Sequence, residues 1–402
     1  MSDAATIFAH ERFKLACAVL RAEHDRTVED IIRLTEIPAP PFGEGPRAAA
    51  YLDMLRAHGL EEVEQDEVGN VLGRRRGFGN GETLVVAAHL DTVFPAGTDV
   101  RVKREGTKLM APGVGDDTRS LAVNLAFLRA MDAAGIRTRA DILFVGDVGE
   151  EGLGDLRGVR HLFTKGRHAG KIDAFLTVDS PEVDRIVTAG VGSKRYRVAF
   201  RGPGGHSFGA FGLVNPMYAM AMAAQRIGAI PVPREPQTTH CVSIVAGGTS
   251  VNAIPNEVRI DVDLRSRSAA ELARLDASFR AIIADAVREE NAARDTRDGE
   301  ITAEITIIGD RPAGETAHGA PIIAATTAAV EQFGYRPSYE ASSTDANIPM
   351  SLGIPALRIG SGGRGGRAHS LDEWIDVEPE ESLRGMSASL LTILAIAGME
   401  LS

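Results

Sequence analysis

The chain has 402 residues, of which 44% are hydrophobic and 25% are charged, and its formal net charge is −11. This length allows a large core and more than one domain, while the acidic balance disfavours nucleic acid as a partner, because phosphate binding needs a basic face. Cys17 and Cys241 cannot form a disulfide framework, so we expect a reduced, cytoplasmic setting. The charged N-terminus and the lack of a stretch of roughly 18 apolar residues lead us to expect neither a signal peptide nor a membrane span.

The first part of the chain, residues 1–192, is predicted to alternate helices and strands. Apolar residues spaced by three and four predict helices over 13–37 and 45–59. The elements expected next, in chain order, are strands at 61–77 and 81–90, a helix at 118–135, and strands at 140–148 and 173–180. Strands that alternate with helices are typical of an α/β domain with a mixed, mainly parallel sheet.

The pattern changes after residue 192. The elements expected there are a strand at 194–202, a helix at 215–230, strands at 237–248 and 256–266, a helix at 268–295 and a strand at 300–310. This β-α-β-β-α-β order is the ferredoxin-like pattern. A helix at 321–334 and a strand at 355–362 then resume the first pattern. The sequence therefore predicts an α+β domain over 193–310, inserted between the two parts of an α/β domain, 1–192 and 311–402.

Polar residues follow several of the apolar strands at the point where each strand ends. His89 and Asp91 face the same side at the end of "VVAAHLD", because residues i and i+2 of a strand point the same way. The polar residues at the later positions are Asp116, Asp117, Glu150, Glu151, Asp179 and, in a glycine-rich loop, His369. Ligand sites of open α/β sheets lie beyond the carboxyl ends of the strands, so we expect these residues to meet at one edge.

Such a group of carboxylates suits metal binding. Like charges a few ångströms apart need compensation, and two histidines with several carboxylates suit zinc, or else cobalt or manganese. A two-ion site needs a bridging carboxylate and about two more ligands for each ion. The residues that meet this count are His89, Asp116, Glu151, Asp179 and His369. Glu150 is left over beside the metals, where a free carboxylate suits a general base. Each motif alone is more often structural or solvated, and only the combination points to a site.

The combination also resembles a known family. The motifs "HLDTVF", "GVGDDTRS", "GDVGEEG", "TVDS", "GPGGHS" and "AHSLDE" occur in the order found in the M20 clan of dinuclear zinc hydrolases. The resemblance covers nearly the whole chain. It implies a zinc-exopeptidase-like catalytic domain, an inserted ferredoxin-like lid that also forms a homodimer, and hydrolysis of amide bonds. The chain departs from many relatives at Thr118, where they have lysine.

The resemblance also implies roles for individual residues. His89 and Asp179 would hold one ion, Glu151 and His369 the other, and Asp116 would bridge them, with a cis peptide bond after it. Among the residues that would take part in catalysis, Asp91 would orient the His89 imidazole. Glu150 would act as the base and later deliver the proton to the leaving amine.

The inserted domain and the C-terminal part add candidates for substrate contact. In relatives, the histidine that matches His206 reaches the partner subunit's active site and stabilises an oxyanion. Asn252, Arg265 and Arg311 are expected to bind substrate, since arginine grips carboxylates in a bidentate way. The alternative is that these residues do not contact substrate, and that Asn252 belongs to a turn while the two arginines lie on the surface. Gly362 would let backbone approach the substrate closely.

The expected function is that of a metal-dependent exopeptidase that hydrolyses short peptides from the N-terminus. Asp179 favours this branch, because tripeptidase T has aspartate there whereas the carboxypeptidase and desuccinylase branches usually have glutamate. The alternatives are an N-acyl amino acid deacylase or a carboxypeptidase of the same family. An inactive binding protein is a less favoured alternative, because every metal position of the family is filled in this sequence.

Overall fold

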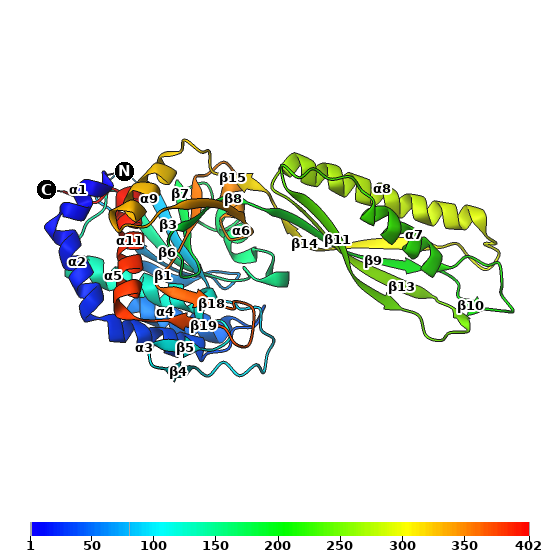
Figure 1. Ribbon diagram of the computed structural model, residues 1–402, viewed down its shortest axis with the longest axis horizontal. Coiled ribbons are helices and arrows are strands. Elements are labelled where there is room, and N and C mark those ends of the chain that lie inside the picture. The colour runs from blue at the N-terminus through cyan, green and yellow to red at the C-terminus, as the bar shows by residue number, and fades with distance from the viewer. Residues whose placement is uncertain (1, 80, 402) are drawn as a thin grey trace. The chain divides into compact units, whose positions relative to one another are not determined.

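The computed structural model describes residues 2–79 and 81–401, which form two compact units. The first unit comprises Met1–Gly190 and Glu315–Ser402, and the second comprises Val191–Gly314. Figure 1 shows helices packed around a sheet in the first unit and a long helix beside a sheet in the second. The predicted mixed α/β class is confirmed. Within the described residues, no helix has the length and apolar character that crossing a membrane requires.

The first unit is built on a nine-stranded sheet. Its strands follow the order β1-β2-β6-β3-β7-β17-β8-β15, with β16 beside β8. Their bounds are β1 Glu61–Gln65, β2 Val71–Arg75, β3 Thr83–His89, β6 Asp141–Asp147, β7 Ala174–Val178, β8 Arg185–Gly190, β15 Gly314–Glu315, β16 Ser338–Ser342 and β17 Ala356–Ile359. The central strands β6, β3, β7 and β17 pair in parallel, whereas β2 is antiparallel to β6. Their carboxyl ends therefore share one edge, the place expected for a ligand site.

Helices cover both faces of this sheet. Alternate residues of β3 enter different cores: Leu84, Val86 and Ala88 belong to one, and Val85 and Ala87 to the other. The first core is formed with α1 Ala4–Ala9, α2 Glu11–Ala22, α3 His24–Thr35, α4 Gly45–Arg56, α5 Arg119–Ala133, α9 Pro321–Gln332 and α11 Pro379–Ala397. The second is formed with α6 Arg157–Thr164 and α10 Asn347–Ser351. Burial on both faces explains why β3 reads as an uninterrupted apolar run.

The helix predicted over 13–37 is two helices. The α2 helix ends at Ala22 and α3 begins at His24, because Glu23 between them has φ −101° and ψ 17°, outside the α-helical region. A second sheet, which the sequence did not indicate, has the order β18-β19-β5-β4. Its strands are β4 Lys103–Glu105, β5 Lys108–Met110, β18 Arg364–Gly366 and β19 Trp374–Asp376. At three residues each, these strands are too short to show an alternating pattern.

The second unit has a four-stranded antiparallel sheet in the order β11-β13-β9-β14. Its main elements are β9 Gly192–Arg201, α7 Pro216–Gly228, β11 Thr238–Gly247, β13 Glu257–Ser266, α8 Ala269–Ala293 and β14 Thr302–Arg311. The two helices pack against the sheet, where the Tyr196 ring stacks on Phe279 with centroids 4.7 Å apart. A short ribbon of β10 Gly205–His206 and β12 Ala253–Ile254 lies outside this sheet.

Candidate metal centre and active site

The structure brings four of the predicted ligand side chains into direct contact. Asp116 lies between two imidazoles: its Oδ1 is 2.9 Å from His89 Nε2, and its Oδ2 is 3.1 Å from His369 Nε2. His369 Nε2 is also 2.8 Å from Glu151 Oε1. A carboxylate that directs one oxygen to each histidine has the arrangement that a bridging ligand needs.

The fold explains why these side chains meet. His89 is the last residue of β3, Asp179 follows β7 directly, and Glu151 lies in the loop after β6. Asp116 precedes α5, and His369 lies between β18 and β19 with a left-handed φ of 64°. The carboxyl ends of the parallel strands thus supply three of the side chains, and the small second sheet carries the histidine to the same edge.

Asp117 and Asp179 extend the group beside His89. The ligand atoms of these three residues all lie within 4.8 Å of one another. Asp117 is fully buried and its Oδ2 accepts the N–H of His89 at 3.1 Å. The peptide bond between Asp116 and Asp117 is cis, as the resemblance implied. Asp117 was seen in the sequence only as a neighbour of Asp116, and its place in the group is new.

The electrostatics of the group fit bound cations. Burial is the main cause that raises the pKa of Asp117, Asp179 and Glu151 above their ordinary values. Hydrogen bonds to Asp116 and then Glu151 raise the pKa of His369 to about 10. Burial thus disfavours the negative charge of three acids, and a bound cation would favour it. Imidazole and carboxylate donors in this balance fit divalent metal ions such as zinc.

Asp91 has a different contact from the one predicted. The Nδ1 of His89 lies 3.0 Å from the backbone oxygen of Asp91 and 3.8 Å from its carboxylate. The Asp91 carboxylate instead accepts the N–H groups of Gly149, Glu150 and Glu151, at 2.9, 3.0 and 2.8 Å. Asp91 therefore orients His89 through its main chain, and its side chain holds the loop that carries Glu150 and Glu151.

Two buried acids that the sequence reasoning did not assign lie next to Glu150. Asp147 and Asp345 are both buried, and each carboxyl group contributes to the shifted pKa of the other. Burial raises the pKa of Asp147 to about 7 and that of Asp345 well above its ordinary value, with the charges of Asp147 and Glu150 contributing to the latter. An acid at the end of an apolar strand was the available signal for Asp147.

In the second unit, His206 and Asn252 lie close together. The β10–β12 ribbon pairs His206 with Ala253, and the N–H of Ser207 donates to the carbonyl of Asn252 at 2.9 Å. His206 is exposed, and its Nδ1 accepts the N–H of Phe208 at 3.2 Å. Its Nε2 edge is thereby directed away from the loop backbone.

Arg265 and Arg311 lie in the four-stranded sheet, at the end far from this ribbon. Both residues pair with Ser193 of β9, one from each side. Along β13, the eight steps from Glu257 to Arg265 span roughly 27 Å. The ribbon with His206 adjoins the Glu257 end, as Figure 1 shows for β10. The predicted substrate residues of the second unit therefore form two separate groups.

Gly362 has a packing reason to be glycine. Its φ is +89°, and a Cβ there would lie 2.5 Å from the N of Met386 and 2.8 Å from the O of Ser382, both in α11. Its N–H donates to the Pro181 carbonyl at 2.8 Å. The predicted contact between Gly362 and substrate gains no support from this environment.

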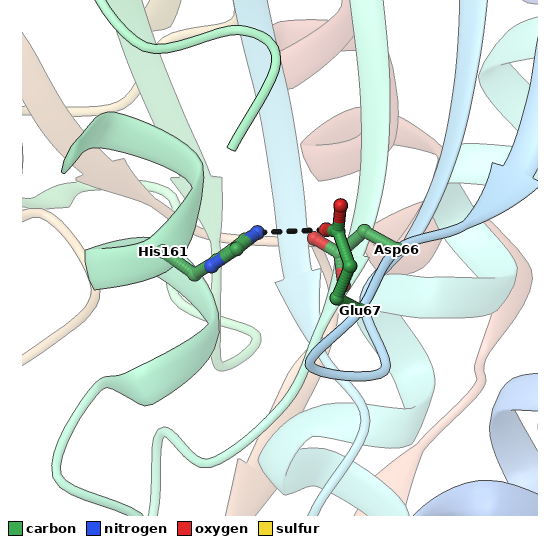
Figure 2. A group of neighbouring side chains, drawn as sticks. All are labelled: Asp66, Glu67 and His161. Atoms are coloured by element: carbon green, nitrogen blue, oxygen red, sulfur yellow. Dashed lines mark hydrogen bonds and ion pairs between the residues drawn. The ribbon is translucent and has the colours of Figure 1, made fainter. Parts of the chain in front are cut away.

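A second group with metal-binding residue types lies in the turn after β1 and on α6 (Figure 2). His161 Nε2 is 3.0 Å from Glu67 Oε2, but the Glu67 side chain is 80% exposed. The third member, Asp66, already accepts the N–H groups of Val68, Gly69 and Asn70 through its Oδ1. The Asp66 carboxylate is thus engaged in shaping the turn, and the group carries no further argument.

The chain is similar to several known hydrolases and peptidases. A curated relative, the putative [LysW]-lysine/[LysW]-ornithine hydrolase of Pyrococcus furiosus, is 31% identical over 138 residues. The match covers 34% of this chain and spans only 38% of the length of that relative. Aminopeptidase PepT from Bacillus cereus superposes with a TM-score of 0.74 at 22% identity, covering 93% of this chain and 99% of the other. A tripeptidase from Staphylococcus aureus has the same TM-score at 18% identity, covering 93% and 98%.

The two solved structures establish a common fold. The sequence model of peptidase family M20/M25/M40 matches residues 85–395, more than half of the chain and a range that includes every predicted metal ligand. The chain therefore belongs to peptidase family M20/M25/M40 and is a hydrolase of amide bonds.

Proposed function

We propose that this protein is a dinuclear metallo-exopeptidase that removes residues from the N-terminus of short peptides. The observation that carries the proposal is the Asp116 carboxylate, held between His89 and His369 with Glu151 beside the second histidine. The proposed ligands are His89 and Asp179 for one ion, Glu151 and His369 for the other, and Asp116 between them. We propose zinc, with cobalt or manganese able to replace it, and a cytoplasmic location, which fits the free thiols of Cys17 and Cys241.

The residues of the site can perform amide hydrolysis. A pair of bound divalent ions supplies an acidic water and polarises the carbonyl of the substrate. Glu150 takes the proton of the attacking water and delivers it to the leaving nitrogen. Asp91 keeps Glu150 at its place through three backbone hydrogen bonds to residues 149–151. His206 donates a hydrogen bond to the oxyanion that forms at the former carbonyl.

The choice of substrate rests on two observations. Asp179 is the residue type of the aminopeptidase branch, and the similar solved structures are named as an aminopeptidase and a tripeptidase. The second candidate is hydrolysis of N-acyl amino acids. It is favoured by the curated relative, whose name places lysine or ornithine on the substrate.

A panel of substrates separates the two candidates. It contains tripeptides with a free amino terminus, the same tripeptides N-acetylated, peptides that end in glutamate, and N-acetyl or N-succinyl amino acids. We expect release of the first residue from the free tripeptides and no release from the blocked ones, measured by chromatography of the products. Cleavage of the acylated amino acids alone would contradict the aminopeptidase proposal and support the second candidate.

We further propose that the active form is a homodimer in which His206 serves the partner's site. The groups of His206 and Arg265 lie beside opposite ends of β13, which are roughly 27 Å apart. An extended tripeptide spans about 10 Å. One small substrate therefore cannot contact both groups of one copy. Two copies related by a twofold axis solve this problem, since each copy presents one group to each site.

Complementation between two inactive variants tests this arrangement. We expect Glu150→Gln and His206→Ala each to be inactive alone. In a mixed dimer, the chain with His206→Ala keeps its Glu150 and receives the partner's intact histidine. Random association should then restore about a quarter of wild-type turnover. A mixture that stays inactive although mixed dimers form would show that His206 does not act across the dimer.

A further inference from the structure

A buried glutamate outside the proposed ligand set holds the loop of the bridging aspartate. Glu373 is 1% exposed. Its Oε2 accepts the N–H of Gly113 at 2.9 Å, and its Oε1 accepts the N–H groups of Gly115 and Asp116 at 2.8 and 2.9 Å. Both carboxylate oxygens are thus directed at the backbone of the loop and not at the group of ligands. Glu373 is the last residue of the motif "AHSLDE", but no role for it could be predicted, because a contact with backbone N–H groups leaves no spacing in the sequence.

The loop needs such an acceptor because its backbone is irregular. Gly113 has a left-handed φ of +76°, and Asp116 and Asp117 have non-helical backbone angles although α5 begins directly afterwards. The N–H groups at 113, 115 and 116 therefore cannot all bond within a regular helix. Buried N–H groups without acceptors cost about 1–3 kcal/mol each. A single carboxylate satisfies all three and fixes their directions.

Glu373 also connects the loops of two proposed ligands. It lies four residues after His369 and directly precedes β19, which pairs with β5 ahead of the Asp116 loop. The N–H of Ala111 donates to the Glu373 carbonyl at 3.1 Å, so both the main chain and the side chain bind the same loop. The two loops pack closely at Gly115, where a Cβ would lie 2.9 Å from Ile375 Cγ2 and 3.3 Å from Glu373 Oε1.

The Asp91 carboxylate makes the same kind of contact with another loop of this site. Asp91 accepts three consecutive N–H groups and thereby fixes the loop of Glu150 and Glu151. Glu373 accepts three N–H groups and thereby fixes the loop of Asp116. Each buried carboxylate lies beneath a loop whose side chains face the candidate metal centre.

We propose that Glu373 is a positioning residue that sets the Asp116 carboxylate between His89 and His369. The inference rests on the proposed function, in which Asp116 bridges two ions. If Asp116 serves both ions, loss of its positioning weakens the binding of both together. Residues that orient metal ligands typically change metal affinity by about 10–100-fold when they are replaced.

The variant Glu373→Gln tests the proposal. Glutamine keeps the shape, but its side-chain nitrogen must face at least one of the three N–H groups and cannot accept a bond from it. We expect a folded protein whose affinity for zinc is about 10–100-fold weaker at both sites, measured by competition with a chelator. Hydrogen exchange of the metal-free protein should be faster at residues 113–116.

A matched control is Glu290→Gln in the second unit. Glu290 is also buried, at 4% exposure, and accepts the N–H of Asn215 at 3.0 Å, but no proposed metal ligand lies in that unit. Its replacement should leave zinc affinity unchanged.

Three outcomes would overturn the inference. Wild-type affinity in Glu373→Gln, with or without lowered thermal stability of the metal-free protein, would show a role in the fold alone. Loss of one ion with unchanged affinity for the other would make Glu373 itself a ligand. If the wild-type protein bound no metal ion, both the proposed function and this inference would be contradicted.

Discussion

Replacing Glu150 by glutamine is expected to lower turnover by about 10²–10⁴-fold, the usual contribution of a general base, while two metal ions remain bound. Glutamine has the size of glutamate but cannot take up the proton of the attacking water. The backbone of residue 150 keeps its hydrogen bond to Asp91 at 3.0 Å, so the loop should stay in place. Steady-state rates on a cleavable peptide and metal analysis of the same preparation measure both quantities.

The adjacent variant Glu151→Gln is the matched control. It makes the same chemical change one residue further along a loop held by the same aspartate, through a bond of 2.8 Å. Because Glu151 Oε1 contacts His369 Nε2 at 2.8 Å, its loss should lower metal content as well as turnover. If Glu150→Gln also lost its metal ions, or if it kept wild-type turnover, Glu150 could not be the base.

Replacing Asp116 by asparagine is expected to remove both ions and with them all metal-dependent turnover. Its two oxygens contact different histidines, one on each side of the group. An amide offers one acceptor oxygen and no negative charge, and the remaining carboxylates cannot replace a bridge. The metal content after dialysis, measured by elemental analysis, should fall from two ions per chain towards none.

The comparison variant for Asp116 is His369→Ala. His369 is 55% exposed at the side chain and contacts only one side of the group, so its removal should cost one ion and leave the other bound. Equal loss in the two variants would speak against a bridging role for Asp116, as would an Asp116→Asn protein that retains both ions.

That the proposed ligands lie close together could be predicted from the sequence, because their places follow a rule of the fold. His89 and Asp179 end parallel strands, and parallel strands end at a common edge. The α/β pattern and the inserted β-α-β-β-α-β order were readable because long strands and helices repeat their apolar spacing. The assignment of roles to single residues depended on the resemblance to a family and on several motifs in one order.

What could not be predicted are contacts made through the main chain. The carboxylates of Asp91 and Glu373 bind backbone N–H groups from distant loops, and no spacing in the sequence records such a bond. Asp147 and Asp345, whose buried carboxyl groups shift each other's pKa, lie almost 200 positions apart in the sequence, so no spacing predicts their proximity. The three-residue strands beside His369 are held by pairing with one another and not by their own propensity.

Whether the protein is a two-ion peptidase is decided by adding metal back to the chelated protein and assaying it on a tripeptide with a free amino terminus. We expect no cleavage without metal, and activity that rises with added zinc until two equivalents per chain are bound. Cleavage that persists after complete metal removal, or saturation without any bound ion, would contradict a two-ion peptidase.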